Sequence, residues 1–434
     1  MSEGTTTFFH PWSEEFIGNI GQVTVGGTPR TSIEKYWDGE VPWMASGDVH
    51  LKHITDVPRR ITELGLRFSN ATLVDPPAVA IGLAGQGRTR GTVALVLTRL
   101  CTNQSVALIS ANPAKLDTEY LFYNLEFRYE ELRARSAGDG RAGLSKQLIE
   151  QIPVPLPPLC EQDKIAEVLS TVDQAIERTE ALIAKQKRIK TGLMQDLLTR
   201  GIDEHGNLRS ESTHEFKDSP LGRIPVEWQE NSLESVSEFV TSGSRGWAQY
   251  YSTEGALFLR IGNLTRSHIN LRFDDSVMVS PPPSSEGKRT SVRTGDLLVS
   301  ITADLGIIGV VPPDFGEAYV NQHIALVRLL PDVVCPRFIG WFLSGRGGQL
   351  QFEALNESGA KAGLNLPTIR RLKVPLPELK EQMQIAKVLD KATKRADEYY
   401  QRGVKLRSLK TALMQDLLTG KKRVTPLLTP ESSC

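Results

Sequence analysis

Two long stretches of the chain carry apolar side chains at alternating spacings of three and four residues. This spacing is typical of a helix that packs along one face as part of a coiled coil. The predicted seam residues are Ile165, Leu169, Val172, Ile176, Ile183, Leu193 and Leu197 in the first stretch and Ile385, Leu389, Tyr399, Leu406, Leu413 and Leu417 in the second. Gly201 and Gly420 follow the two stretches, as glycines that end helices do. The pattern predicts two long helices that pack antiparallel.

The apolar pattern shifts locally at the same place in both stretches. If the spacing continued without a change, Lys190 and Lys410 would take the inner position, but the adjacent residues Ile189 and Leu409 are apolar. We therefore expect Ile189 and Leu409 to take the inner position, with the two lysines beside the stripe. The first stretch, residues 161–198, would be about 57 Å long at about 1.5 Å per residue.

The two stretches belong to a tandem repeat with a period of 220 residues. Val-Pro-Leu-Pro at 154–157 recurs at 374–377, and Leu-Met-Gln-Asp-Leu-Leu-Thr at 193–199 recurs letter for letter at 413–419. Upstream the match is looser, with Asn103-Gln104 answered by Asn321-Gln322 at an offset of 218. Each half is therefore a variable globular part followed by a segment of fixed length.

The repeat divides the chain into six parts. Short β-rich runs punctuated by glycine and proline, followed by helical patterns, make each globular part mixed α and β. The predicted parts are a first head at 1–152, a first helix at 153–200, a polar linker at 201–225, a second head at 226–372, a second helix at 373–420 and a tail at 421–434. The expected fold class is α+β, with two similar heads joined by an antiparallel coiled coil in a pseudo-twofold arrangement.

Composition places the chain among ordinary globular proteins. It has 434 residues, zero formal net charge and 40% hydrophobic residues, which argues against wholesale disorder. No apolar run approaches the roughly 18 residues that span a bilayer, and residues 1–10 lack a basic signal-peptide region. The four cysteines form no Cys-x-x-Cys pair, which argues against a disulfide framework or zinc ribbon and favours the cytoplasm.

Motifs that could carry catalysis are weak. Asp-Pro-Pro-Ala at 75–78 resembles the Asp-Pro-Pro-aromatic loop of amino-methyltransferases, but Ala78 cannot stack on a base and the second half has no counterpart. The glycine-rich loop at 82–91 fits neither the dinucleotide fingerprint nor a P-loop. It is either a hairpin loop that needs positive φ or a flexible loop offering arginines to a polyanion, and both can hold. Asp48, His50 and His53 form a poor metal set. We predict no catalytic residue and no metal site.

Two diverged heads on helices of equal length suggest a device that reads two sites at a fixed separation. Reading DNA requires Arg, Lys, Asn or Gln side chains that reach base edges from exposed loops. We expect the DNA-contacting residues to be drawn from the following candidates: Arg30, Arg88, Arg90, Arg141, Lys146, Arg245, Trp247, Arg260, Asn263, Lys361 and Asn365.

The duplicated Val-Pro-Leu-Pro, Glu-Gln and Leu-Met-Gln-Asp-Leu-Leu-Thr motifs resemble those of the specificity subunit of type I restriction–modification systems. The resemblance runs from Gly-Gly-Thr-Pro at 26–29 to Thr419. It implies that each head is a target recognition domain for one half of a bipartite DNA sequence, and that the coiled coil sets the spacer. The second head departs from the pattern, because Thr-Ser-Gly-Ser at 241–244 replaces Gly-Gly-Thr-Pro, so Arg245 is less firmly placed than Arg30.

The same resemblance implies partners. Double-stranded DNA, two methyltransferase subunits and further restriction subunits are expected, and no membrane. S-adenosylmethionine, ATP and Mg would be used by those partners, and this chain would be a noncatalytic subunit without a cofactor of its own.

An interaction scaffold with two protein-binding heads is the competing hypothesis. Both heads are slightly acidic, and the basic excess lies in residues 373–434, with 13 basic and 7 acidic side chains. Charge alone favours the scaffold. The resemblance outweighs it, because partner subunits can supply the phosphate contacts while this chain supplies base contacts. We therefore expect weak DNA binding by the chain alone and tight, specific binding with its partners.

Overall fold

The computed structural model describes residues 12–85, 87–135, 143–281, 285–357 and 364–428. The chain divides into two compact units. Unit 1 comprises Met1–Thr179 and Arg402–Cys434, and unit 2 comprises Glu180–Gln401. Each unit contains one head, the first half of the helix that follows it and the last part of the other long helix.

The head of unit 1 is built on a five-stranded sheet with strand order β2-β9-β6-β7-β4. The strands are β2 (Gly21–Val25), β4 (His53–Ile54), β6 (Ala78–Gly82), β7 (Val93–Val96) and β9 (Val106–Ala111). Neighbours pair antiparallel except β4 with β7. The central strands are apolar and fully buried. α3 (Thr118–Phe127) packs on one face of the sheet with buried aromatic residues, and Met44, Val49 and Ile54 belong to the apolar cluster on the other face.

A smaller sheet forms a second layer of this head. Its order is β5-β3-β8, from β3 (Trp37–Met44), β5 (Arg60–Ile61) and β8 (Cys101–Thr102). Trp37 and Trp43 meet edge to face in its core, 5.2 Å apart. The remaining elements are β1 (Ser13–Phe16) paired with β10 (Pro153–Leu156), and helices α1 (Ile17–Ile20), α2 (Glu63–Arg67), α4 (Tyr129–Arg135) and α5 (Lys146–Glu150).

Unit 2 repeats this plan. Its main sheet has the order β14-β21-β18-β19, and its second sheet the order β15-β17-β16-β20. The strands are β13 (Gln229–Ser232), β14 (Ser237–Ser242), β15 (Tyr251–Ser252), β16 (Ala256–Leu259), β17 (Met278–Val279), β18 (Leu297–Ser300), β19 (Ile308–Val310), β20 (Ala318–Val320), β21 (Ile324–Leu329) and β22 (Lys373–Leu376). Its shorter helices are α7 (Ser285–Thr290), α8 (Pro336–Ser344), α9 (Arg346–Glu357) and α10 (Leu366–Arg371).

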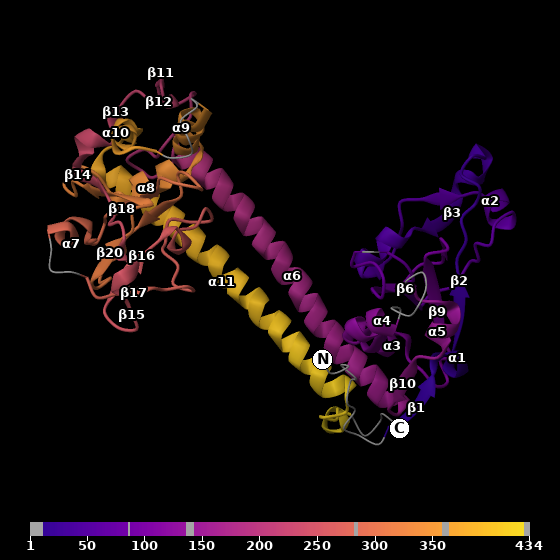
Figure 1. Ribbon diagram of the computed structural model, residues 1–434. Coiled ribbons are helices and arrows are strands. Elements are labelled where there is room, and N and C mark those ends of the chain that lie inside the picture. The colour runs from indigo at the N-terminus through magenta and orange to yellow at the C-terminus, as the bar shows by residue number, and fades with distance from the viewer. Residues whose placement is uncertain (1–11, 86, 136–142, 282–284, 358–363, 429–434) are drawn as a thin grey trace. The chain divides into compact units, whose positions relative to one another are not determined.

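The two long helices are α6 (Leu159–Leu197) and α11 (Leu379–Leu418). Gly201 and Gly420, with φ of 65° and 73°, follow their ends. In unit 1 the start of α6 lies beside the end of α11 (Figure 1), and both contribute to one apolar core. In unit 2 the start of α11 and the end of α6 do the same. The helices therefore run antiparallel in each unit, as the sequence predicts.

All thirteen predicted seam residues are buried or half-buried. The expected local shift is wrong, however, because Ile189 and Leu409 are 41% and 47% exposed and the lysines occupy the inner position. Lys410 Nζ lies 2.6 Å from Glu126 and 3.0 Å from Asp173. Lys190 Nζ lies 4.8 Å from the centre of the Trp341 ring. Because each ammonium group has a favourable contact at the inner position, the alternating spacing of three and four residues continues through both lysines.

The segment expected to be a linker is a folded part of unit 2. Residues 216–225 form a hairpin of β11 (Phe216–Ser219) and β12 (Gly222–Pro225). Ile202 and Ile224 lie in the core of the unit. The few apolar residues of this segment therefore pack it against the core of unit 2. Its average composition is polar and does not indicate this packing.

Candidate nucleic-acid interface

Three turns of the unit 1 head meet at one edge of the main sheet. Because β2, β9, β6 and β7 alternate in direction, the end of β2 lies beside the start of β9, the end of β6 and the start of β7. The turns are residues 26–30 after β2, residues 103–105 before β9 and residues 83–92 between β6 and β7. We call these three turns edge 1.

A close backbone approach holds edge 1 together. The Gly27 amide donates to the Thr102 carbonyl at 2.8 Å, and the Thr28 hydroxyl donates to the Gln104 side chain. A Cβ on Gly26 would lie 2.1 Å from the Thr102 carbonyl oxygen. Only glycine fits there, which gives the Gly-Gly of residues 26–29 a physical reason.

Edge 1 presents polar and basic side chains. Arg30, Arg88 and Gln104 are exposed, and Arg90 is half-buried. In the described part of the chain, Arg90 Nε has no hydrogen-bond partner although it is buried. Gly85 and Gly91 have φ of 130° and 80°, so the loop between β6 and β7, described except for residue 86, needs positive φ and also brings Arg88 and Arg90 to the edge.

Edge 2 is the corresponding edge of the unit 2 sheet. It comprises residues 243–246 after β14, residues 321–323 before β21 and residues 301–307 between β18 and β19. A Cβ on Gly243 would lie 2.0 Å from the Asn321 carbonyl oxygen. Gly243 therefore does in unit 2 what Gly26 does in unit 1, and Thr-Ser-Gly-Ser preserves the close approach. Arg245 is exposed on this edge.

Sequence reasoning missed several polar groups on edge 2. The Thr302 hydroxyl lies 2.7 Å from His323 Nδ1, and Gln322 Nε2 lies 3.0 Å from His323 Nε2. All three side chains are half-buried. The repeated Asn-Gln pair was the available signal, but the strand order was needed to place it beside Arg30 in one unit and Arg245 in the other.

Two predicted contacts are core residues instead. Trp247 is 3% exposed and stacks on Phe258 with ring centres 5.7 Å apart. Asn263 is buried, accepts from the Arg260 amide at 2.8 Å and donates to the Arg272 carbonyl at 2.9 Å. Trp247 packs in an aromatic cluster of the core, and Asn263 holds backbone groups of its own loop together, so neither side chain is presented to a ligand.

The remaining candidates lie in different settings. Arg260 pairs with Asp275 at 2.8 Å. Lys146 begins α5, exposed and 3.7 Å from Glu150. The Asn365 side chain caps α10 by accepting from the Thr368 amide at 2.9 Å.

Arg141 and Lys361 lie outside the described residues. The residues that follow them do reach the two edges. The Leu144 amide donates to the Leu83 carbonyl and the Leu364 amide to the Ile301 carbonyl, both at 2.8 Å.

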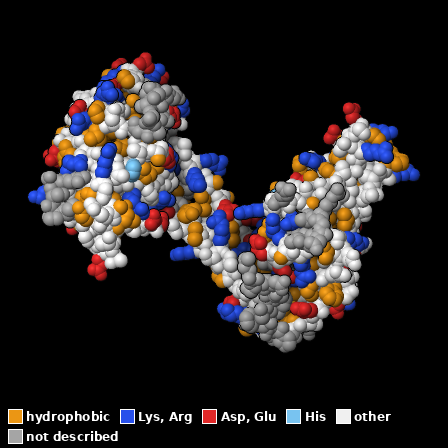
Figure 2. All heavy atoms as spheres, viewed as in Figure 1, with side chains coloured by type: hydrophobic (Ala, Val, Ile, Leu, Met, Phe, Trp, Pro, Cys, Tyr) orange, Lys and Arg blue, Asp and Glu red, His pale blue; other side chains and the backbone are white. Residues whose placement is uncertain are grey.

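Charge on the heads is mixed. On the face seen in Figure 2, Lys and Arg side chains are interspersed with Asp and Glu. This fits the slightly acidic sums of the two heads, so neither head is strongly basic.

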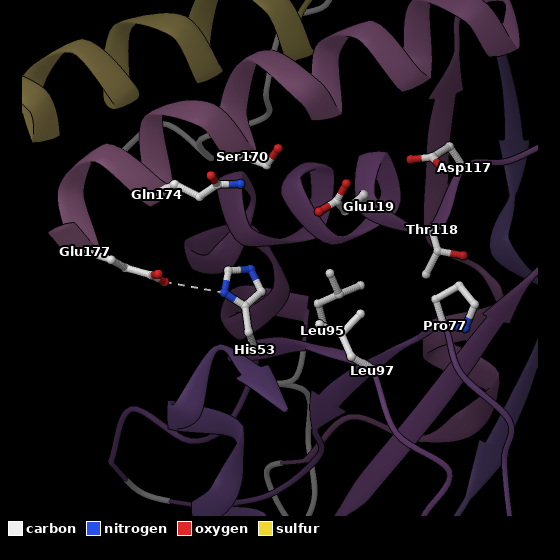
Figure 3. Close-up of a pocket in the computed structure, with 10 residues that line it drawn as sticks. All are labelled: His53, Pro77, Leu95, Leu97, Asp117, Thr118, Glu119, Ser170, Gln174 and Glu177. Atoms are coloured by element: carbon white, nitrogen blue, oxygen red, sulfur yellow. Dashed lines mark ion pairs between the residues drawn. The ribbon is translucent and has the colours of Figure 1, made fainter. Parts of the chain in front are cut away.

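A cavity of about 460 Å³ lies at the opposite edge of the unit 1 sheet, between the head and α6 (Figure 3). It is lined by His53, Pro77, Leu95, Leu97, Asp117, Thr118, Glu119, Ser170, Gln174 and Glu177. His53 Nδ1 lies 3.5 Å from Glu177. Burial raises the pKa of Glu119, and Asp117 raises it further. This acidic, partly apolar lining is unlike the two edges, so we do not assign the cavity to nucleic acid.

Among the described residues there is no group of three or more His, Cys, Asp or Glu side chains placed to hold a metal ion. Asp48, one of the weak candidates, instead accepts from the Ala45 amide at 2.8 Å. Cys101 and Cys335 are free thiols, whereas Cys160 is disulfide-bonded, which the spacing of the cysteines did not lead us to expect.

Both halves of the chain match the same family of known proteins. The family model of the type I restriction modification DNA specificity domain matches residues 10–187 and again residues 225–401. The MjaVIII specificity subunit of Methanocaldococcus jannaschii is 24% identical over 421 residues, covering 96% of this chain and 94% of the relative. The EcoBI specificity subunit of Escherichia coli is 26% identical, covering 68% of this chain and 63% of the relative.

Solved structures show the same fold. A type I restriction–modification S subunit from M. genitalium superposes with a TM-score of 0.62 at 15% identity, covering 96% of this chain and 98% of that one. A chain from a study of type I system assembly and conformational transition gives a TM-score of 0.51 at 18% identity, covering 95% of this chain and 98% of that one.

The molecule is therefore a duplicated DNA-specificity protein, with one such domain in each unit. More particularly, the chain belongs to the family of type I restriction–modification DNA specificity subunits. Within the described residues, no helix combines the length and the apolar character needed to cross a membrane.

Proposed function

We propose that edge 1 and edge 2 each read one half of a bipartite DNA target. The observation that carries the proposal is the equivalence of the two edges: each combines a glycine-dependent turn, an Asn-Gln pair and a hairpin loop at one end of the main sheet. Their sequences differ around this shared frame, so the two halves of the target would differ.

The side chains on the edges suit the major groove. Arginine can donate two hydrogen bonds to guanine, and glutamine or asparagine can pair with adenine. Edge 1 would use Arg30, Arg88 and Gln104, which are exposed. Edge 2 would use Arg245 and Gln322, with His323 oriented by Thr302.

The helices would set the spacer between the half-sites. α6 and α11 have 39 and 40 residues, and the repeat between them is free of insertions. An α-helix is stiff and its length is fixed by residue number, so a pair of such helices suits the role of a ruler.

The chain would recognise DNA without catalysing a reaction on it. Support comes from relatives that are called specificity subunits of restriction enzymes, a name that leaves catalysis to other subunits. Two methyltransferase subunits, using S-adenosylmethionine, and restriction subunits, using ATP and Mg, would complete the assembly. The scaffold alternative is not favoured, because both heads match a DNA specificity domain.

An exchange of heads tests the proposal. Residues 1–152 are replaced by the corresponding head of a related subunit, and the methylated sequence is determined in cells that also make the modification subunits. We expect one half-site to change while the other half-site and the spacer remain. A change in both half-sites, or in neither, would contradict the assignment of one head to each half.

A further inference from the structure

Each long helix begins with a buried glutamate that is held by an arginine. Glu161 is the third residue of α6 and Glu381 the third residue of α11, and their side chains are 2% and 11% exposed. Arg423 Nε donates to Glu161 at 2.7 Å, and its Nη2 donates to the other carboxylate oxygen. Arg209 donates to Glu381 through two nitrogens, at 2.6 and 3.1 Å.

The arginines come from the segments that follow the opposite helix. Arg423 lies just after the end of α11, and Arg209 lies beyond the end of α6. Each ion pair therefore joins the start of one helix to the end of the other. The two arginines are 214 positions apart, not 220, so aligning the chain with itself does not reveal that they correspond.

A tryptophan completes each arrangement. Trp12 immediately precedes β1, and its ring lies 5.8 Å from the Arg423 guanidinium. Trp228 immediately precedes β13, and its Nε1 donates to Glu381 at 3.4 Å. We call Trp12, Glu161 and Arg423 clasp 1, and Trp228, Glu381 and Arg209 clasp 2. Each clasp joins the start of a head, the start of its helix and the end of the other helix.

Clasp 2 also explains a glycine. A Cβ on Gly201 would lie 2.2 Å from the Glu381 carboxylate and 2.4 Å from the Trp228 ring. The Ile202 amide donates to the same carboxylate at 2.9 Å. The chain after α6 is thus folded tightly onto the start of α11, so residues 201–209 act in unit 2 as residues 420–423 act in unit 1.

The energetics of a buried ion pair allow each clasp to disfavour a misaligned pair of helices. Leaving one partner of such a pair unpaired is costly, whereas the intact pair gains little over apolar packing. The middle of the seam defines the register weakly, because it contains Thr179, Gln186, Ala392, Ala396 and Gly403. A slip of one heptad would move one helix by about 10 Å and would separate each glutamate from its arginine.

We propose that clasps 1 and 2 are positioning residues that fix the register of α6 against α11, and through it the number of base pairs between the half-sites. The inference rests on the proposed function and deepens it. The segments after the two helices would then have the same role, which is to supply the arginine of a clasp, although their sequences differ.

The test uses the full chain with its modification subunits and a set of DNAs that differ only in spacer length. The variants are Arg423→Met and Arg209→Met. The controls are Lys422→Met, in the same segment as Arg423, and Arg223→Met, in the β11–β12 hairpin that follows residues 201–209; their side chains are 70% and 56% exposed. We expect the clasp variants to methylate neighbouring spacer lengths as well, with both half-sites unchanged, and the controls to keep the original spacer.

Further variants keep the test decisive if a methionine variant fails to fold. Glu161→Gln and Glu381→Gln retain the size and some hydrogen bonds, and should broaden the spacer to a smaller extent, while Arg423→Lys should restore part of the preference lost in Arg423→Met. Folded variants that keep a single spacer would overturn the role of the clasps and leave the proposed function standing. A wild-type complex that methylates no bipartite sequence would instead overturn the proposed function itself.

Discussion

Single glycines decide whether the two edges can form. The backbone of residues 26–29 passes so close to Thr102 that a side chain at Gly26 would meet a carbonyl oxygen, and Gly243 is in the same position against Asn321. The first glycine stands out in the sequence within Gly-Gly-Thr-Pro. The second is hidden in Thr-Ser-Gly-Ser, and only the packing of the turn against β21 reveals its role.

Gly26→Ala should destabilise unit 1 by about 1–3 kcal/mol, because the obstacle is backbone that cannot move aside cheaply. Gly47→Ala is the matched control in the same head, since an added Cβ there meets nothing within 4 Å. Urea unfolding of the two variants measures the difference. Equal stabilities would show that the turn can shift without cost.

Gln104→Ala should relax the base preference at one position of one half-site and leave the fold intact, because this side chain is exposed. A good bidentate pair is worth about 1–3 kcal/mol of discrimination. Gln322→Ala should act in the same way on the other half-site. The methylated motif of each variant is the measurement, and an unchanged motif in both would exclude the Asn-Gln turns from base reading.

Asp173 should make unit 1 sensitive to acid. Burial would raise its pKa, but the hydrogen bond and charge of Lys52 and the charge of Lys410 outweigh burial and hold the pKa below 3.8. A carboxyl whose pKa is lower in the folded state stabilises the fold above its unfolded pKa and loses that contribution as pH falls through the folded value.

Asp173→Asn should therefore lower stability at pH 7 and flatten its decline below about pH 4. Asp163→Asn, an exposed position on the same helix, serves as the control. Unfolding free energies measured from pH 7 to pH 3 check this, and an unchanged pH dependence in Asp173→Asn would contradict it.

Among the elements, the long helices were the most predictable and the segment after α6 the least. A regular apolar stripe and a glycine just beyond its end fix a helix locally, so α6 and α11 end within three residues of the predicted ends at 200 and 420. The predicted starts at 153 and 373 are wrong, because Pro153–Leu156 and Lys373–Leu376 form strands β10 and β22 and the helices begin at Leu159 and Leu379. The ion pairs and aromatic contacts that the helix residues make involve parts of the chain that are distant in sequence. The sequence pattern therefore could not show that Lys190 and Lys410 point inward, or that Arg209 holds Glu381.

The heads were predictable only in outline. Short buried strands signal mixed α and β structure, but the strand order that brings the turns of each edge together depends on non-local pairing. Trp247 and Asn263 illustrate the error that follows. Both residue types suit DNA contacts, yet Trp247 stacks on Phe258 in the core and Asn263 binds backbone groups of its own loop.

The same lysine of the repeat meets two different environments. Lys410 sits between Glu126 and Asp173, whereas Lys190 contacts the Trp341 ring and the Ser267 carbonyl. Burial lowers the pKa of Lys190 to about 8. Because this pKa lies below the usual 10.5, the charged lysine destabilises unit 2 below pH 8, and the penalty disappears as pH rises from 8 to 10.5.

Lys190→Met should therefore raise the stability of unit 2 at pH 7 and raise it less at pH 10. Lys410→Met should destabilise unit 1 at pH 7, because it leaves two carboxylates with less compensation. Lys187→Met, exposed on the same helix as Lys190, is the control. Thermal unfolding at the two pH values tests the pair, and destabilisation by Lys190→Met at pH 7 would contradict the argument.

At the scale of the whole molecule, the zero net charge is unexpected for a DNA specificity subunit and needs an explanation. Most of the basic excess lies in the last helix and tail, and the heads are slightly acidic. A protein that binds DNA alone usually carries its own positive field. A neutral specificity subunit fits a division of labour in which partner subunits grip the phosphates and this chain selects the bases.

The chain alone should therefore bind its target only slightly better than other DNA. With the modification subunits, binding should become tight and specific, with a salt dependence set mainly by the partners' phosphate contacts. Titrations at two salt concentrations, with and without partners, measure both effects. Tight specific binding by the isolated chain would contradict this division.

Genome-wide detection of methylated bases, in cells that carry this chain with its modification subunits, tests the central claim most directly. The account predicts one bipartite motif with two different half-sites and a single spacer length, and loss of that motif when this chain is deleted. Methylation scattered without a motif, or confined to one continuous sequence, would contradict a duplicated reader with a fixed spacing.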